Sequence, residues 1–243
     1  MQSVNPSDLG EAGAHTHRLS RSSRMIILRC EAVIFDLDGV LVDSAEAIAH
    51  HWKTWATRND VDSEHLLRVA QGRRTLDTLA IVAPHLDADQ ELARLALAES
   101  TDLSGVQPFP NAWELVHNLE PDQWAVATSG TRAVAEARLN HVGLPIPSVL
   151  VTADQITRGK PDPEGFTTAA RLLRKPAESC IVIEDSPPGV EAAHTACMRC
   201  VAVATTHVAV QLAGAHFTVA GLDRVATRQA GGSLELCLQQ AAT

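Results

Sequence analysis

The sequence predicts an α/β fold, in which a doubly wound parallel sheet carries an all-α insertion near its start. Short continuous apolar runs at 32–35, 124–128 and 180–184 are typical of strands that are buried on both faces of a parallel sheet. Helical patterns separate the later runs, and this alternation indicates right-handed crossover connections between parallel strands. Residues 44–105 contain no strand pattern, so we expect only helices there.

The helical insertion is expected to begin with a capping pattern. Asp43 and Glu46 are three residues apart, which predicts a helix capped by Asp43 and running to about Arg58. Further helices are predicted at 62–70, 74–83 and 88–99. The Pro-rich segment 107–110 marks the return of the chain to the sheet.

The remainder of the chain alternates between the two kinds of element. Pro163 is expected at the first position of a helix that Asp162 caps and that runs to about Arg174. The other predicted elements are strands at 149–151, 200–204 and 217–219 and helices at 132–141 and 188–196.

Composition excludes several classes of function. The 243-residue chain is 45% hydrophobic, as in a soluble globular protein, and its net charge of −9 argues against a nucleic-acid partner. No apolar run is long enough to span a membrane. Five cysteines do not form a disulfide framework, so we expect a cytoplasmic protein. Residues 1–24 have no periodicity and are expected to be a disordered tail, or an upstream extension if Met25 is the true start.

Polar side chains follow four of the predicted strands. Asp36 and Asp38 follow the first, 128–130 (Thr-Ser-Gly) the second, and 184–186 (Glu-Asp-Ser) a later one, while Lys160 lies in the loop after 149–151. A single aspartate at such a place is most often a turn cap. Because the carboxyl ends of parallel strands lie along one edge, these groups are predicted to converge on one crevice.

The chemistry of these groups suits a phosphoryl group. The carboxylates of Asp36, Asp38, Glu184 and Asp185 need a cation, and oxygen ligands favour Mg²⁺. A lysine, the Thr128 hydroxyl and the backbone N–H groups of Ser129 and Gly130 would bind phosphoryl oxygens. One aspartate can attack phosphorus, and a second, two residues on, can protonate the leaving alkoxide.

The motifs resemble those of the haloacid dehalogenase superfamily of aspartyl-phosphate enzymes. They are Asp36-Leu37-Asp38-Gly39, Thr128-Ser129-Gly130, Gly159-Lys160-Pro161-Asp162-Pro163-Glu164 and Glu184-Asp185-Ser186-Pro187-Pro188-Gly189. The resemblance covers about residues 30–230. It implies a Rossmann-like core formed by residues 25–43 and 106–243, and a helical cap formed by residues 44–105.

The resemblance also implies a role for each motif residue. Asp36 is implied as the nucleophile and Asp38 as the acid/base, while Thr128 binds phosphoryl oxygens and Lys160 holds the nucleophile and the phosphate. Mg²⁺ is implied to bind Asp36, the backbone carbonyl of Asp38, and Asp185, with Glu184 close by or joined through water. One departure is Cys197, which stands where the family usually has a glycine at a helix end.

The substrate class follows from segments outside the motifs. Gly72-Arg73-Arg74-Thr75-Leu76-Asp77, Trp124–Thr131 and Ala204-Thr205-Thr206 are similar to those of glycerol-phosphate, 2-deoxyglucose-6-phosphate and other sugar phosphatases. This implies a monomeric enzyme that hydrolyses small sugar or polyol phosphates, without a membrane or nucleic-acid partner. Arg73 and Arg74 are candidate substrate ligands, although either could be a packing or solvated residue. A β-phosphoglucomutase-like mutase is the alternative, because the motifs do not separate it from a phosphatase.

Overall fold

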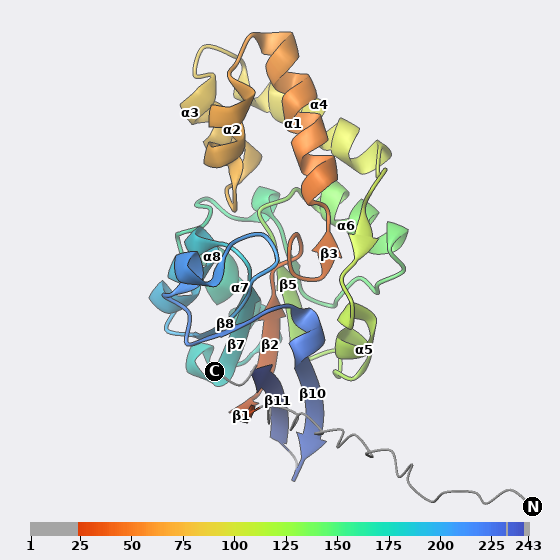
Figure 1. Cartoon of the computed structure of the whole chain (residues 1–243), viewed down its shortest axis with the longest axis vertical. Helices are drawn as coiled ribbons and strands as arrows, with labels where there is room; N and C mark the ends of the chain where they lie inside the picture. The colour runs from red at the N-terminus through yellow and green to blue at the C-terminus, as the bar shows by residue number, and fades with distance from the viewer. Residues whose placement is uncertain (1–23, 232, 241–243) are drawn as a thin grey trace, which may run out of the picture.

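The computed structural model describes residues 24–231 and 233–240 (Figure 1). The expectation of a disordered tail over residues 1–24 lies outside the described residues, apart from Arg24. That residue begins strand β1 (Arg24–Cys30).

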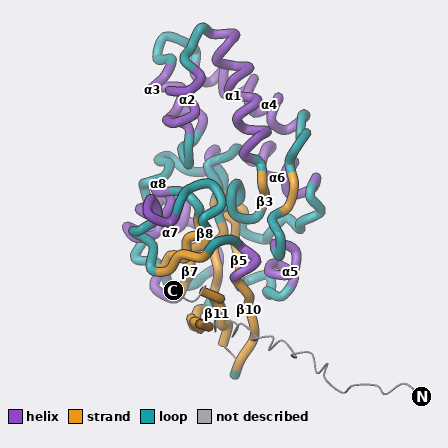
Figure 2. The backbone as a smooth tube through the Cα atoms, in the orientation of Figure 1, coloured by secondary structure: helices purple, strands orange, loops and turns teal. Residues whose placement is uncertain are grey.

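A six-stranded parallel sheet forms the centre of the molecule, in the order β6-β5-β2-β7-β8-β9 (Figures 1 and 2). Its strands are β2 (Ala32–Phe35), β5 (Trp124–Ala127), β6 (Leu150–Val151), β7 (Cys180–Glu184), β8 (Arg199–Val203) and β9 (Phe217–Val219). The first strand in sequence, β2, pairs in parallel with both β5 and β7. The predicted α/β fold with a doubly wound parallel sheet is therefore confirmed.

Strand β2 lies in the interior of the sheet, and each of its side chains is apolar and fully buried. Val33 and Phe35 pack in a layer with α5 (Ala112–His117) and α6 (Arg132–His141). The alternate residues of β2 pack in a second layer with α7 (Glu164–Leu173) and α8 (Pro187–Thr195). The alternation of side chains along a strand thus supplies both layers of the core.

The predicted helical insertion forms four helices above the carboxyl edge of the sheet (Figure 1). They are α1 (Ala45–Asn59), α2 (Ser63–Ala70), α3 (Thr75–Val82) and α4 (Ala88–Thr101), and we call them the cap helices. They have a hydrophobic cluster of their own, in which Trp52 and Trp55 pack against Leu66, Leu79 and Leu95. The division of the chain into a cap and a core domain at residues 44 and 105 stays a prediction.

The two chain segments that join the cap helices to the sheet pair with each other. Strand β3 (Val42–Asp43) is antiparallel to β4 (Gln107–Pro108). The prediction that Asp43 caps the first helix is wrong, because Asp43 pairs with Gln107 and the helix starts after Ser44.

Two details at other helix ends were also predicted. Pro163 occupies the N-cap and α7 begins at Glu164, one residue later than expected, although Asp162 Oδ1 does accept the Glu164 N–H at 3.0 Å. Cys197 has a φ of 59°, so it adopts the left-handed conformation that favours the glycine of the family pattern.

A second sheet, which was not predicted from the sequence, is antiparallel and lies at the end opposite the cap helices (Figure 1). Strand β11 (Ser233–Gln240) runs between β1 and β10 (Val225–Ala230). Alternate residues Leu234, Leu236 and Leu238 of β11 join the core layer. Glu235, on the other face, forms ion pairs with Arg29 and Arg228, at 3.3 and 2.8 Å.

Short 3-10 helices complete the described chain at Ala153–Gln155, Ala177–Ser179, Ala209–Leu212 and Leu222–Arg224. Within the described residues, none of the helices combines the length and the apolar composition that a bilayer-spanning segment needs.

Candidate active site

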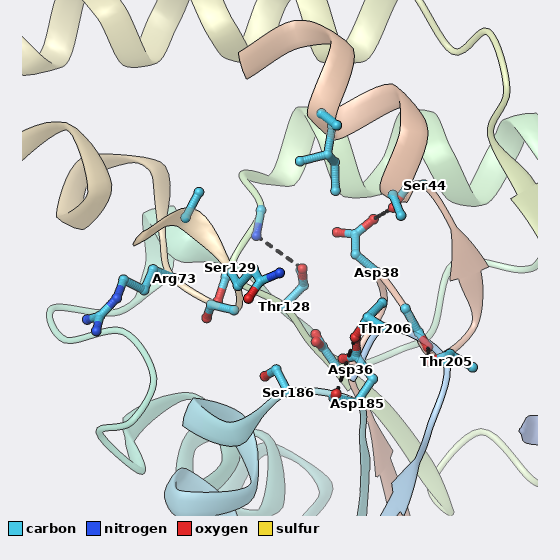
Figure 3. Close-up of a pocket in the computed structure, with 18 of the residues that line it drawn as sticks. Asp36, Asp38, Ser44, Arg73, Thr128, Ser129, Asp185, Ser186, Thr205 and Thr206 are labelled. Carbon is cyan, nitrogen blue, oxygen red and sulfur yellow. Dashed lines mark hydrogen bonds between the residues drawn. The ribbon is translucent and has the colours of Figure 1, made fainter. Parts of the chain in front are cut away.

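The polar residues that follow β2, β5 and β7 lie together at the edge of the sheet that faces the cap helices (Figure 3). A cavity of about 520 Å³ opens between this edge and the cap helices. Asp36, Asp38, Thr128 and Asp185 line its floor, and Trp52 is among the cap residues that line its walls. The polar residues that follow these strands therefore converge on one crevice.

Lys160 holds two carboxylates at the bottom of this site. Its Nζ lies 3.0 Å from Asp36 Oδ2 and 2.6 Å from Glu184 Oε1. Although burial alone would lower the pKa of Lys160, the two carboxylates outweigh it and raise the pKa above its ordinary value. Lys160 is consequently a permanent positive charge at the end of β2.

Glu184 is fully buried and is fixed from several sides. Its Oε2 accepts the backbone N–H groups of Asp185 and Ser186, both at 2.7 Å, and the Ser186 hydroxyl at 3.0 Å. Burial would raise the pKa of Glu184, but Lys160 and these hydrogen bonds lower it below its usual value. Glu184 is thus a structural carboxylate that positions Lys160.

The carboxylates at the ends of β2 and β7 form a donor set that fits a divalent cation. Asp36, Glu184 and Asp185 each offer an oxygen, and these atoms lie within 4.8 Å of one another. Asp36 Oδ1 is buried without a hydrogen-bond partner. Burial raises the pKa of Asp36 to about 7, and burial together with Glu184 and Asp36 raises that of Asp185. A hard cation would satisfy the orphaned oxygen and relieve the repulsion that raises both pKa values.

Thr128, Ser129 and Gly130 turn the chain from β5 toward α6. Thr128 Oγ1 accepts the Gly130 N–H at 3.0 Å and lies at the floor of the cavity (Figure 3). Ser129 Oγ donates to the Gly72 carbonyl at 2.9 Å, so this hydroxyl contacts the cap segment. The predicted binding of phosphoryl oxygens by these three residues stays a prediction.

Asp38 follows Asp36 by two residues, but its carboxylate has a separate environment. Figure 3 shows it beside Ser44, on the cap side of Asp36 and Asp185. Its Oδ1 accepts the Ser44 hydroxyl at 2.6 Å and lies 2.8 Å from Arg138 Nη1. The main chain of Asp38 thus stays near the predicted cation site while its side chain faces the cavity.

The two candidate arginines of the cap segment behave differently. Arg73 lines the cavity, but its guanidinium points away from the carboxylates (Figure 3). Arg74 is buried, pairs with Asp77 at 2.8 Å and donates to the Ile156 carbonyl at 3.0 Å. Arg74 therefore joins the cap segment to the sheet, and the structure does not bring it into the cavity.

Several residues of the site were missed by the sequence analysis. Arg138 of α6 and Glu99 of α4 line the cavity, as does Thr206, which hydrogen-bonds to Asp185 Oδ2. His207 bridges the Asp185 carbonyl, at 3.0 Å, and the Gln71 side chain, at 3.2 Å. A buried arginine in the last turn of a helix is not distinguished by sequence from an ordinary helix-terminal cation, so no pattern pointed to Arg138.

The arrangement is suited to phosphoryl transfer. It provides a carboxylate that lines the cavity beside a fixed lysine, a candidate cation site, hydroxyl and amide donors, and a second carboxylate on the cap side. In-line attack on phosphorus needs these groups on one side of the substrate and a proton donor near the leaving oxygen.

Comparison with known proteins agrees with this geometry. The model of the haloacid dehalogenase-like hydrolase family matches residues 33–203. Hexitol phosphatase A of Escherichia coli is 39% identical over 168 residues, which are 67% of this chain and 78% of that protein. Glycerol-1-phosphate phosphohydrolase 2 of Saccharomyces cerevisiae is 32% identical over 201 residues, or 76% and 79% of the two chains.

A solved structure has a similar fold over most of both chains. The crystal structure of a hydrolase from Pseudomonas syringae has a TM-score of 0.70 and 26% sequence identity, and it covers 79% of this chain and 94% of that one. The family model spans β2 through β8 and includes all four motifs. The chain belongs to the haloacid dehalogenase-like hydrolase family.

Proposed function

We propose that this protein is a Mg²⁺-dependent phosphatase that hydrolyses monophosphates of small sugars or polyols through a phosphoryl group on Asp36. The observation that carries the proposal is the Asp36–Lys160–Glu184 cluster, in which Asp36 lines the cavity and is held from behind by Lys160 and, through it, by Glu184. The relatives named as hexitol and glycerol-1-phosphate phosphatases support the substrate class.

In the first step, an oxygen of Asp36 attacks phosphorus, and the bond between phosphorus and the sugar oxygen breaks. Asp38 gives its proton to the leaving alkoxide, so the neutral sugar or polyol departs. Lys160 neutralises charge on the phosphoryl oxygens, and Thr128 and the N–H groups of Ser129 and Gly130 donate to them. Asp36 becomes an acyl phosphate.

In the second step, water attacks the same phosphorus and gives a proton to Asp38. The bond between phosphorus and the Asp36 oxygen breaks, which restores the carboxylate and releases inorganic phosphate. Mg²⁺, held by Asp36, Asp185 and the backbone carbonyl of Asp38 with Glu184 close by, would supply positive charge next to the phosphoryl group.

The walls of the cavity favour a neutral organic group. Ile48, Ala49, Trp52 and Leu67 line the cap side. Of the basic side chains that line the cavity within the described chain, Arg138 pairs with two carboxylates, His207 contacts Gln71, and Arg73 points outward (Figure 3). A mutase must bind a second phosphate there, which calls for available cations. The cavity therefore supports a phosphatase over the mutase alternative.

The proposal also places the enzyme in the cytoplasm as a monomer that acts on small molecules, with no nucleic-acid or membrane partner. The net charge of −9 supports the exclusion of nucleic acid, because a basic surface is the usual basis of such binding.

The test is phosphate release from a substrate panel, with Mg²⁺ and with a chelator. The panel contains glycerol 1-phosphate, glycerol 3-phosphate, 2-deoxyglucose 6-phosphate, mannitol 1-phosphate, fructose 1-phosphate and β-glucose 1-phosphate. We expect Mg²⁺-dependent release from one or a few of these. Asp36→Asn should lower the rate by at least about 1,000-fold, because an amide is a poor nucleophile, and it also reports any contaminating phosphatase. Conversion of β-glucose 1-phosphate to glucose 6-phosphate without phosphate release would make the protein a mutase.

A further inference from the structure

Arg138 connects the sheet side of the cavity to the last cap helix. Its side chain is 3% exposed, although it belongs to α6 and lines the cavity. Nη1 lies 2.8 Å from Asp38 Oδ1, and Nη2 lies 2.6 Å from Glu99 Oε2 on α4. The planar guanidinium of Arg138 therefore binds the carboxylates of both Asp38 and Glu99, and its fixed geometry sets the direction of both contacts.

Stability alone is a weak explanation for this arrangement. Removing a guanidinium and two carboxylates from water is costly, and apolar residues of similar size are often at least as stabilising. Arg138 Nε is also buried without a hydrogen-bond partner, which adds a further cost. Buried groups that are held at such a cost beside a reactive carboxylate indicate a role in function.

The hydrogen bond and the ion pair of the Asp38 side chain lead to the cap helices, the first through Ser44 and the second through Arg138. Ser44, which donates to Asp38 Oδ1 at 2.6 Å, is the N-cap of α1, where the chain enters the cap helices. Glu99, at the other end of the ion pair, lies in the last turn of α4, where the chain leaves them. The orientation of the Asp38 carboxylate therefore depends on residues at the start of the first cap helix and at the end of the last one.

We propose that Arg138 is a positioning residue that orients Asp38 and, through Glu99, couples this orientation to the position of the cap helices. The inference rests on the proposed function, in which Asp38 exchanges a proton with the leaving oxygen and with water. Arg138 does not touch the reacting atoms. It determines the position of the Asp38 carboxylate when the cap helices lie over a substrate.

The coupling predicts which substrates depend on Arg138. A sugar or polyol leaves as an alkoxide and needs a proton from a correctly placed Asp38, whereas p-nitrophenolate leaves without one. Displacing Arg138 should thus lower kcat/KM, which covers the steps up to release of the leaving group, much more for the first class than for the second. A purely structural role would lower both rates in proportion.

The experiment compares Arg138→Lys and Glu99→Gln with wild type on the best sugar or polyol phosphate and on p-nitrophenyl phosphate. Lysine keeps the charge but cannot reach both carboxylates as a fork. We expect Arg138→Lys to lower kcat/KM for the alkoxide substrate about 10- to 100-fold, with a loss in kcat/KM below about threefold on p-nitrophenyl phosphate. Glu99→Gln should show the same selectivity with a smaller loss.

Arg132→Lys is the matched control. Arg132 lies on the same helix and pairs with Glu136 at 2.9 Å, but it is 40% exposed and does not line the cavity. It should leave both rates unchanged. Equal losses on both substrates for Arg138→Lys, or a comparable selective loss for Arg132→Lys, would overturn the inference.

A measurement without turnover separates this inference from the proposed function. Arg138→Lys should increase hydrogen exchange of the α4 amides around Glu99, and Arg132→Lys should not. Unchanged exchange in α4 would overturn the coupling to the cap helices, whatever the enzyme hydrolyses. A wild-type protein that releases no phosphate from either substrate would overturn the proposed function and the proton-transfer role of Arg138 with it.

Discussion

Asp36 has an environment that the fold alone makes unfavourable for a carboxylate. It is 6% exposed, one of its oxygens has no partner, and its pKa is raised to about 7 by burial despite the adjacent Lys160. In the unfolded chain, an aspartate has a pKa near 4. Between these two values the folded protein without metal binds more protons at Asp36 than the unfolded chain does, so its stability falls as the pH rises.

We therefore expect metal-free protein to be less stable near pH 8 than near pH 5 as far as Asp36 is concerned, and Asp36→Asn to reduce this difference. Asp185, whose pKa is also raised, acts in the same direction and keeps part of it. The measurement is urea unfolding in chelator at both pH values. Asp122→Asn, which removes a carboxylate that is 70% exposed, is the control and should leave the difference unchanged. A larger difference in Asp36→Asn would contradict the assignment.

Added Mg²⁺ should reverse the sign of this effect in the wild type near pH 8. A cation that binds only the folded state stabilises it, and it does so best when the carboxylates are ionised. The same unfolding experiment with Mg²⁺ measures this, and Asp36→Asn should gain less stability than the wild type. An equal gain in both proteins would place the cation elsewhere.

At the scale of elements, the site depends on how closely α8 approaches the end of β7. A Cβ atom added to Gly189, in the first turn of α8, would lie 1.7 Å from Glu184 Oε1. Glu184 in turn holds Lys160. The glycine therefore lets α8 start beside the buried carboxylate, which accepts the Ser186 N–H and hydroxyl, while the Gly189 N–H donates to Ser186 Oγ.

Gly189→Ala should displace Glu184 and lower the free energy of unfolding by about 1–3 kcal/mol, with a loss of activity through Lys160. Denaturant unfolding and kcat measure the two effects. Gly165→Ala is the control, because its Cβ would meet only Ile156 Cδ1 at 3.8 Å in the first turn of α7. It should be neutral or slightly stabilising. A neutral Gly189→Ala would show that the helix can shift without cost.

The parallel sheet was predictable because continuous apolar runs identify buried strands, and the residues that follow them identify the site edge. The antiparallel sheet was missed, although β11 alternates Leu234, Leu236 and Leu238 with polar residues. Arg138 was not predictable, since its role arises from Asp38 and Glu99, which only tertiary structure brings to it. Local pattern thus reveals strand ends, but not contacts between distant elements.

At the scale of the molecule, the cap helices contact the sheet side at points around the cavity. Arg74 donates to the Ile156 carbonyl, Ser129 to the Gly72 carbonyl, and Glu99 pairs with Arg138. The two chain segments that connect the parts covalently pair with each other as the short strands β3 and β4. Cavity access consequently depends on contacts far from one another in sequence.

Arg74→Gln should weaken the contact between the cap helices and the sheet side, since glutamine cannot reach Ile156 and also keep the pairing with Asp77. We expect KM for the sugar or polyol phosphate to rise about three- to tenfold, because substrate binding must then stabilise the closed arrangement. Steady-state kinetics measures this. The control is Arg68→Gln on the exposed surface of α2, which should leave KM unchanged. An unchanged KM in Arg74→Gln would argue that other contacts suffice for closure.

The antiparallel sheet at the far end also has a consequence for how the protein is made. Its central strand, β11, is the last element of the described chain, whereas its edge partner β1 is the first. On the ribosome, β1 and later β10 emerge before the strand that must lie between them. Both must therefore wait, with unpaired backbone groups, until β11 has been synthesised. The parallel core and the catalytic groups precede β11 in the sequence, so β11 is added to a molecule whose site residues have already been synthesised.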